Sequence, residues 1–152
     1  MTNDERTINL EQKIKTLQLT YAAALADSVV RYGNAGVLDK ITEQKRAEQM
    51  NNGAALAAKL GVAEPKQAIE KTQDLFECAD FVCIDTSSGF EAVATRCAIC
   101  SISKQMGKYS PCQIYCLSPM EAMMKGVSPD TEFQVVSTLW ESDRCIIRAK
   151  LT

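Results

Sequence analysis

The spacing of the apolar residues changes near Asp80 and divides the chain into a helical half and a mixed half. Before Asp80, apolar residues recur at steps of three and four, which places them on one face of a helix. This spacing predicts a first helix along the stripe from Leu10 to Leu25, a second over 37–60 and a third over 65–76. The triplet Asn-Asn-Gly at 51–53 is a combination that can break or kink the second helix.

After Asp80, short β-rich runs alternate with helical stretches and with turns that contain glycine or serine. The expected elements are, in order, strands over 81–84 and 90–95, helices over 97–106 and 111–125, and strands over 133–139 and 145–151. Each pair of strands is predicted to form a hairpin, and both helices between the hairpins carry cysteines. The order predicts an α+β fold, in which N-terminal helices pack on an antiparallel sheet built from the two hairpins.

No linker, repeat or low-complexity tract divides the 152 residues, so we expect a single domain over 1–152. Residues 1–77 form its helical half and residues 78–152 its cysteine-rich α+β half. The net charge of −2 and the scattered basic residues argue against a nucleic-acid partner and against an anionic membrane surface. No apolar stretch approaches the ~20 residues that span a bilayer. The polar, acidic N-terminus does not resemble a secretory signal, which predicts a cytoplasmic location with reduced thiols.

Seven cysteines fall between Cys78 and Cys145, and the chain contains no histidine. The absence of imidazole excludes catalytic schemes that use histidine as a base and metal sites that use it as a ligand. Any chemistry must therefore rest on thiolates, carboxylates, amines, hydroxyls or a bound metal. An odd number of cysteines also argues against a closed framework of disulfides.

Four of the cysteines have a spacing that metal centres use. Cys97 and Cys100 are three residues apart on one predicted helix, and Cys112 and Cys116 are four apart on the next, so each pair shares a helix face. If the two helices pack together, the four sulfurs form a site for zinc or an iron–sulfur cluster, which both prefer thiolate ligands. Burial as small apolar side chains is the alternative for these four cysteines.

The three remaining cysteines are assigned more simply from the sequence. Cys78 and Cys83 flank or occupy a short predicted strand, and we expect both to be packing residues. Cys145 begins an apolar strand, where either packing or a role in the site is compatible with the pattern.

From Thr95 onward, the chain resembles the L-2-amino-thiazoline-4-carboxylic acid hydrolase-like family of bacteria and archaea. The likeness lies in Thr95-Arg-Cys-Ala-Ile-Cys100, in Cys116 and in the run Thr138-Leu-Trp-Glu-Ser-Asp-Arg-Cys145. The family's usual cysteines match Cys97, Cys116 and Cys145. The architecture is also similar to the 4-vinyl-reductase domain, a small-molecule-binding module.

The resemblance implies a hydrolase-like enzyme that acts on a C–N or C–S bond of a small heterocyclic or amidine-like acid. Cys116 would be its leading nucleophile, and Cys145 and Cys97 would supply a second thiolate or metal ligands. A nucleophilic thiol needs a lowered pKa, for which Arg96, Arg144 or a helix N-terminus is available.

The chain also departs from the family. Ser118 and Pro119 stand where family members have an aspartate, a residue suited to act as general base. Cys100 and Cys112 are additional, and they would complete the coordination sphere of a metal. The alternative function is therefore a non-hydrolytic protein with a cysteine-bound iron–sulfur cluster or zinc ion that binds or senses a small molecule. A third alternative is a structural protein with buried cysteines, in a homo-oligomer assembled through its helices.

Overall fold

The computed structural model describes all 152 residues and has five α-helices, one π-helical turn and four strands. The order of the elements is α1 (Asn3–Asn34), α2 (Leu38–Leu60), α3 (Pro65–Phe76), β1 (Val82–Thr86), β2 (Gly89–Ala94), α4 (Ala98–Met106), the π-turn η1 (Gln113–Leu117), α5 (Ser118–Val127), β3 (Glu132–Ser137) and β4 (Cys145–Lys150). The predicted α+β class, with helices before and between two hairpins, is confirmed. None of the helices combines the length and the apolar character that a membrane crossing requires.

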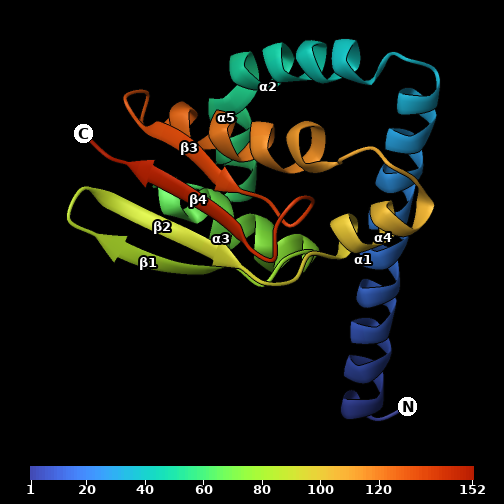
Figure 1. Cartoon of the computed structure of the whole chain (residues 1–152). Helices are drawn as coiled ribbons and strands as arrows, with labels where there is room; N and C mark the ends of the chain where they lie inside the picture. Colours follow the sequence, from blue (N-terminus) through green and yellow to red (C-terminus); the bar gives the residue numbers. More distant parts are fainter.

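The four strands form one antiparallel sheet in the order β1-β2-β4-β3, so the two hairpins join through β2 and β4. Alternate residues of these central strands face the helices: Phe90, Ala92 and Ala94 on β2, and Cys145, Ile147 and Ala149 on β4. Helices α2, α3 and α5 lie behind one face of the sheet (Figure 1), where Met120, Met123 and Met124 of α5 complete the core, and α1 and α4 lie beyond the end of the strands. The other face is open, and it leaves the apolar side chains Val82 and Ile84 of β1 exposed.

Helix α1 buries a different face from the one that its apolar stripe suggests. Its buried residues are Ala22, Ala26, Val29 and Gly33, which lie in its second half, and α4 is the element that contacts it most. Small side chains allow this close approach, because a Cβ at Gly33 would collide with the ring of Tyr109. The stripe residues Leu10, Ile14 and Leu17 stay exposed on the first half of the helix, which extends past the body of the protein (Figure 1).

Helix α2 is continuous through Gly53, so the triplet at 51–53 does not break it. Gly53 instead lies where α2 meets α5, and a Cβ there would collide with the backbone carbonyl of Ala122. Gly126 of α5 faces the backbone of α2 in the same way. Beside this contact the buried Glu121 carboxylate pairs with Arg46 of α2 at 2.6 Å, which links the two helices, and with Lys125 of its own helix at 2.9 Å.

The predicted helix over 111–125 contains a wide π-turn, η1, before α5 begins. Pro119 explains the turn, because a proline lacks an N–H group and its ring would clash with the carbonyl group four residues earlier, that of Tyr115. The N–H of Ser118 donates to the carbonyl of Gln113, five residues back, which widens the helix at this point. Cys116 lies on this widened turn, and Cys112 is the residue directly before it.

Candidate functional site

The site is built where the segment before β1 pairs with the segment after β2. Ala79 and Cys97 form an isolated antiparallel bridge beyond the end of the hairpin. The N–H of Ala98 donates to the carbonyl of Cys78 at 2.7 Å, and the N–H of Asp80 donates to that of Arg96 at 3.3 Å. This pairing places the Cys78 sulfur 3.9 Å from the Cys97 sulfur, a contact that was not predicted from the sequence, and the assignment of Cys78 as a packing residue stays a prediction.

The carboxylate of Asp80 fixes the backbone that leads into Cys97. It accepts hydrogen bonds from the Thr95 hydroxyl at 2.7 Å and from the N–H groups of Thr95 and Arg96, both at 2.8 Å. These bonds, that of the Thr95 hydroxyl most strongly, lower the pKa of Asp80 to about 2. Asp80 is thus a structural anion that orients the turn, and a group with so low a pKa is a weak base at neutral pH.

Cys97 is the N-cap residue of α4, at the positive end of the helix dipole, and its side chain makes no capping hydrogen bond. Its sulfur contacts that of Cys78 at 3.9 Å, and the N–H of Ile99 donates to the Cys78 sulfur at 3.4 Å. The thiols of Cys100 and Cys78 and the N–H groups of Cys100 and Ile99 are the polar groups that act on the Cys97 sulfur. Together they hold the pKa of Cys97 well below its usual range, although burial acts in the opposite direction. Cys78 and Cys100, which donate their S–H groups to this sulfur or to Cys112, have a raised pKa.

A second pair of thiols lies deeper in the protein. The sulfurs of Cys100 and Cys112 are 3.5 Å apart, and both residues are buried. They face a closed apolar cavity of about 20 Å³, which has room for about one water molecule. Five cysteines contribute to its wall: Cys97, Cys100, Cys112, Cys116 and Cys145.

Burial is the largest cause of the pKa shifts of two other cysteines on this cavity wall, Cys116 and Cys145. It raises the pKa of the Cys116 thiol well above the ordinary value and that of Cys145 to about 12. Both side chains are therefore neutral thiols near pH 7 in the protein as it stands. Their assignment as catalytic residues stays a prediction, but neither has the low pKa that a nucleophile needs.

The four predicted metal ligands, Cys97, Cys100, Cys112 and Cys116, do come together on one cavity. Their sulfurs are arranged as contacts between pairs, and no group of three or more cysteine, aspartate or glutamate side chains has an arrangement that could hold a metal ion. The predicted metal centre therefore stays a prediction. Cys83 lies away from the cluster on β1, near Lys66 and Glu70, and packs against the core as expected.

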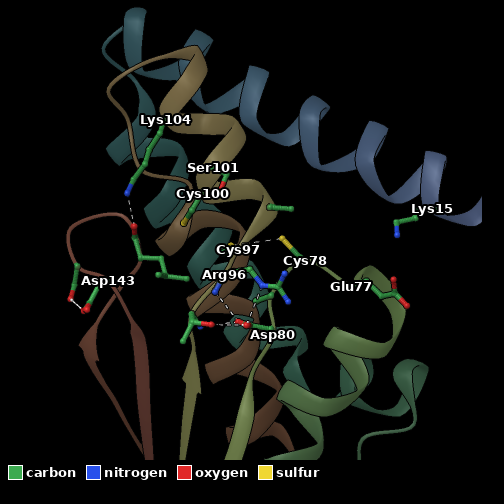
Figure 2. Close-up of a pocket in the computed structure, with 15 residues that line it drawn as sticks. Lys15, Glu77, Cys78, Asp80, Arg96, Cys97, Cys100, Ser101, Lys104 and Asp143 are labelled. Carbon is green, nitrogen blue, oxygen red and sulfur yellow. Dashed lines mark hydrogen bonds and ion pairs between the residues drawn. The ribbon is translucent and has the colours of Figure 1, made fainter.

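An open pocket of about 670 Å³ lies on the other side of Cys97, and the size is typical of a small-molecule site. Cys78, Cys97 and Cys100 contribute to its wall. Six charged residues line it in equal numbers of each sign: Lys15, Arg96 and Lys104, and Glu77, Asp80 and Asp143. In Figure 2 the sulfurs of Cys78 and Cys97 lie between the two groups of charges, with Lys104 and Asp143 on one side and Lys15 and Glu77 on the other.

Sequence reasoning missed the contribution of Cys78, although the hairpin held information about it. Thr86 pairs with Gly89 at the turn, Cys78 lies eight residues before Thr86, and Cys97 lies eight residues after Gly89. Extending the antiparallel register of the hairpin therefore brings Cys78 near Cys97, and the observed pairing is offset from this register by one residue, with Ala79 opposite Cys97. The sequence contains no comparable signal for Lys15, because its position at the pocket depends on how α1 packs against the rest of the protein.

Comparisons of the chain with protein-family models, with curated proteins and with solved structures gave no match.

Proposed function

We propose that this protein is a cysteine-dependent, hydrolase-like enzyme in which Cys97 is the nucleophile. The observation that carries the proposal is the position of the Cys97 sulfur at the N-terminus of α4 and on the wall of the open pocket. A helix N-terminus stabilises a thiolate, and the pocket gives a small molecule access to it. This proposal keeps the thiol chemistry implied by the family resemblance and moves the leading role from Cys116 to Cys97.

The pocket supports a substrate that carries both positive and negative charge. Its three cationic and three anionic side chains match a zwitterion better than a simple anion, which would meet three carboxylates. An amidine-like or amino-substituted acid has these two charges. The substrate class expected from the resemblance, a small heterocyclic or amidine-like acid, is compatible with this lining.

The reaction on such a substrate has two steps. The Cys97 thiolate attacks the carbon of a C–S or C–N bond, a new carbon–sulfur bond forms, and the leaving sulfur or nitrogen takes a proton from solvent. Water then attacks the same carbon, its proton passes to solvent, and the bond to Cys97 breaks to restore the thiolate. The pocket is open, so water reaches the site without a separate channel.

Alkylation kinetics test the assignment of the nucleophile. At about pH 6, where an ordinary thiol with a pKa near 8.5 reacts slowly, a sub-stoichiometric amount of iodoacetamide should label Cys97 before the other six cysteines. Peptide mass spectrometry identifies the labelled residue. Cys97→Ser should abolish the fast phase, and Cys116→Ser should retain it. First labelling of Cys116 would contradict the proposal and favour the original assignment.

A metal centre is the second candidate function, and one distance favours it. Two thiolates bound to tetrahedral zinc, with Zn–S bonds of ~2.3 Å, are about 3.8 Å apart. The Cys100 and Cys112 sulfurs are separated by 3.5 Å, and Cys97 and Cys116 line the same cavity. Elemental analysis and the absorption spectrum of anaerobically purified protein distinguish an iron–sulfur cluster, zinc and a metal-free thiol enzyme.

The Cys112→Ser variant separates the two candidates. If the four cysteines bind a metal, this variant should lose the metal and melt at a lower temperature, because structural metal binding is coupled to folding. If Cys97 acts as a free nucleophile, the variant should keep the fast alkylation of Cys97. Cys83→Ser is the matched control, because Cys83 lies outside the cluster.

A further inference from the structure

The two thiols at the floor of the open pocket are close enough to be joined by movement of their side chains alone. Their sulfurs are 3.9 Å apart, and a disulfide requires ~2.05 Å. The backbones are already held side by side by the Ala79–Cys97 bridge and by the hydrogen bond from Ala98 to Cys78. A disulfide therefore requires the two sulfurs to approach each other by about 2 Å, and rotation of the two side chains is the movement that we expect to supply it.

Cys78, rather than Cys100, is placed to react with a group bound at Cys97 from the pocket side. Cys78 is half-buried and lines the open pocket together with Cys97. Cys100 also contributes to the pocket wall, but it is buried and its sulfur contacts that of Cys112 at 3.5 Å. Cys78 also donates its S–H group to Cys97, a bond that is released when the Cys97 sulfur becomes part of a disulfide.

We infer that Cys78 and Cys97 form a redox-active dithiol that reduces small disulfides carrying both amino and carboxylate groups. The inference rests on the proposed function, because it uses Cys97 as the attacking residue. It adds Cys78 as a second reacting residue and a sulfur of the bound disulfide as the atom that is attacked. No protein base for the activation of water is needed in this reaction, since each leaving group is a thiolate. This suits a site that has no histidine and whose Asp80 is engaged by Thr95 and Arg96.

Two exchanges complete the reaction. The Cys97 thiolate attacks one sulfur of the bound disulfide, the S–S bond of the ligand breaks, and the first thiolate leaves and takes a proton from solvent. Cys78 then loses its proton to solvent and attacks the Cys97 sulfur, the mixed disulfide breaks, and the second thiolate leaves. One disulfide is reduced to two thiols, and the two protein thiols are oxidised to one Cys78–Cys97 disulfide.

The charge distribution of the pocket predicts which disulfides react fastest. Cations and carboxylates lie on both sides of the sulfurs in Figure 2, so each end of a symmetrical zwitterionic disulfide meets both signs of charge. Cystine is a probe of this class. Cystamine, which has only amino groups, and dithiodiglycolate, which has only carboxylates, are analogues with the same S–S bond.

The experiment mixes fully reduced, metal-free protein with each disulfide, stops the reaction with an alkylating reagent and measures intact and peptide masses. With cystine the wild-type protein should release two thiols per molecule and form the Cys78–Cys97 disulfide, and it should react faster than with either analogue. Cys78→Ser should release one thiol and accumulate a mixed disulfide on Cys97, with release of the second thiol at least about 100-fold slower. Cys83→Ser is the matched control and should behave as the wild type. Cys78→Ala should repeat the result of Cys78→Ser, and circular dichroism checks that both variants fold.

Three outcomes would overturn the inference. Release of two thiols by Cys78→Ser would show that another cysteine completes the reaction. A wild-type protein that stops at a mixed disulfide on Cys97 would refute the dithiol and leave Cys97 as the nucleophile of the proposed function. A Cys97 that reacts with neither the disulfides nor iodoacetamide would contradict both proposals.

Discussion

Cys97 differs from the other six cysteines in what surrounds its sulfur rather than in its sequence neighbours. It is the N-cap residue of α4, its sulfur contacts that of Cys78 at 3.9 Å, and it lies between the open pocket and the closed cavity. Cys116, four residues after Cys112, lies behind it with no polar partner and is a neutral thiol for that reason. Identical side chains therefore have opposite protonation states within one cluster.

At the residue scale, the Asp80 carboxylate gives a prediction for acid stability. Its pKa is about 2 in the folded protein and about 3.9 in an unfolded chain, so it stabilises the fold above pH 4 and loses this effect as the pH falls toward 2. We expect Asp80→Asn to be less stable than the wild type at pH 7. The difference in unfolding free energy should shrink between about pH 5 and about pH 2.

Urea unfolding of both proteins across this pH range measures the effect. Asp74→Asn is the control, because Asp74 is exposed and accepts no side-chain hydrogen bond. A stability difference that stays constant down to about pH 2 would show that the hydrogen bonds from Thr95 and Arg96 do not depend on the charge of Asp80.

The sequence identified the cysteine-rich half as the location of the site, and the spacing of Cys97 and Cys100 identified its centre. It could not assign the cysteines to pairs, because the two close contacts, Cys78 with Cys97 and Cys100 with Cys112, join residues from different elements. The helix spacing of Cys112 and Cys116 placed both at the cavity, but the π-turn between them depends on Pro119, whose effect was not considered.

At the element scale, most boundaries follow from residues that begin or end a helix. Gly61 ends α2 in the left-handed conformation with φ of 72°, and Pro65 begins α3. The effect of Gly53 does not follow from the local sequence, because this glycine makes room for the backbone of α5, a contact between distant parts of the chain. Glycine lowers the stability of a helix at its own position. Here this cost is smaller than the gain from the surface that α2 and α5 bury when they approach closely.

The contact between α2 and α5 predicts that replacing Gly53 by alanine lowers the stability of the protein, whereas the same change in an exposed helix raises it. In an exposed helix interior, glycine to alanine stabilises by about 1 kcal/mol. Gly53→Ala should instead destabilise the protein by roughly 1–3 kcal/mol, because the new methyl group collides with the Ala122 carbonyl.

Chemical denaturation of Gly53→Ala measures the change, with Asn52→Ala as the matched control. Asn52 is the preceding residue on the same helix and is exposed, so its substitution should change the stability by less than about 0.5 kcal/mol. A Gly53→Ala protein that is more stable than the wild type would mean that α2 and α5 can move apart without a loss of unfolding free energy.

At the scale of the whole molecule, the first half of α1 is the part least covered by the rest of the chain (Figure 1). Leu10, Ile14 and Leu17 are 53%, 53% and 68% exposed. Their spacing of four and then three residues is that of a coiled-coil seam. We therefore expect two copies of the chain to associate through this part of α1, which is a specific form of the predicted homo-oligomer.

Sedimentation velocity over a range of concentrations tests this association. Leu17→Lys should shift the protein toward the monomer by placing a charge in the seam. Thr16→Lys is the control, since Thr16 projects from a different face of the same helix turn. A wild-type protein that stays monomeric at high concentration would contradict the expectation.

The pairing of β2 with β4 has a consequence for the newly made chain. Cys145 and Leu139 form part of the wall of the closed cavity, yet they are synthesised after Cys116 and the other cysteines. At roughly 5–20 residues per second, the ribosome needs a few seconds to travel from residue 116 to residue 145. During that interval the other four cysteines of the cavity wall have been made and the strand that completes the wall has not, so we expect their thiols to be less protected from oxidants in the incomplete chain than in the folded protein. Cells that make this protein under oxidative stress should therefore accumulate damage in nascent chains before they do so in the folded pool.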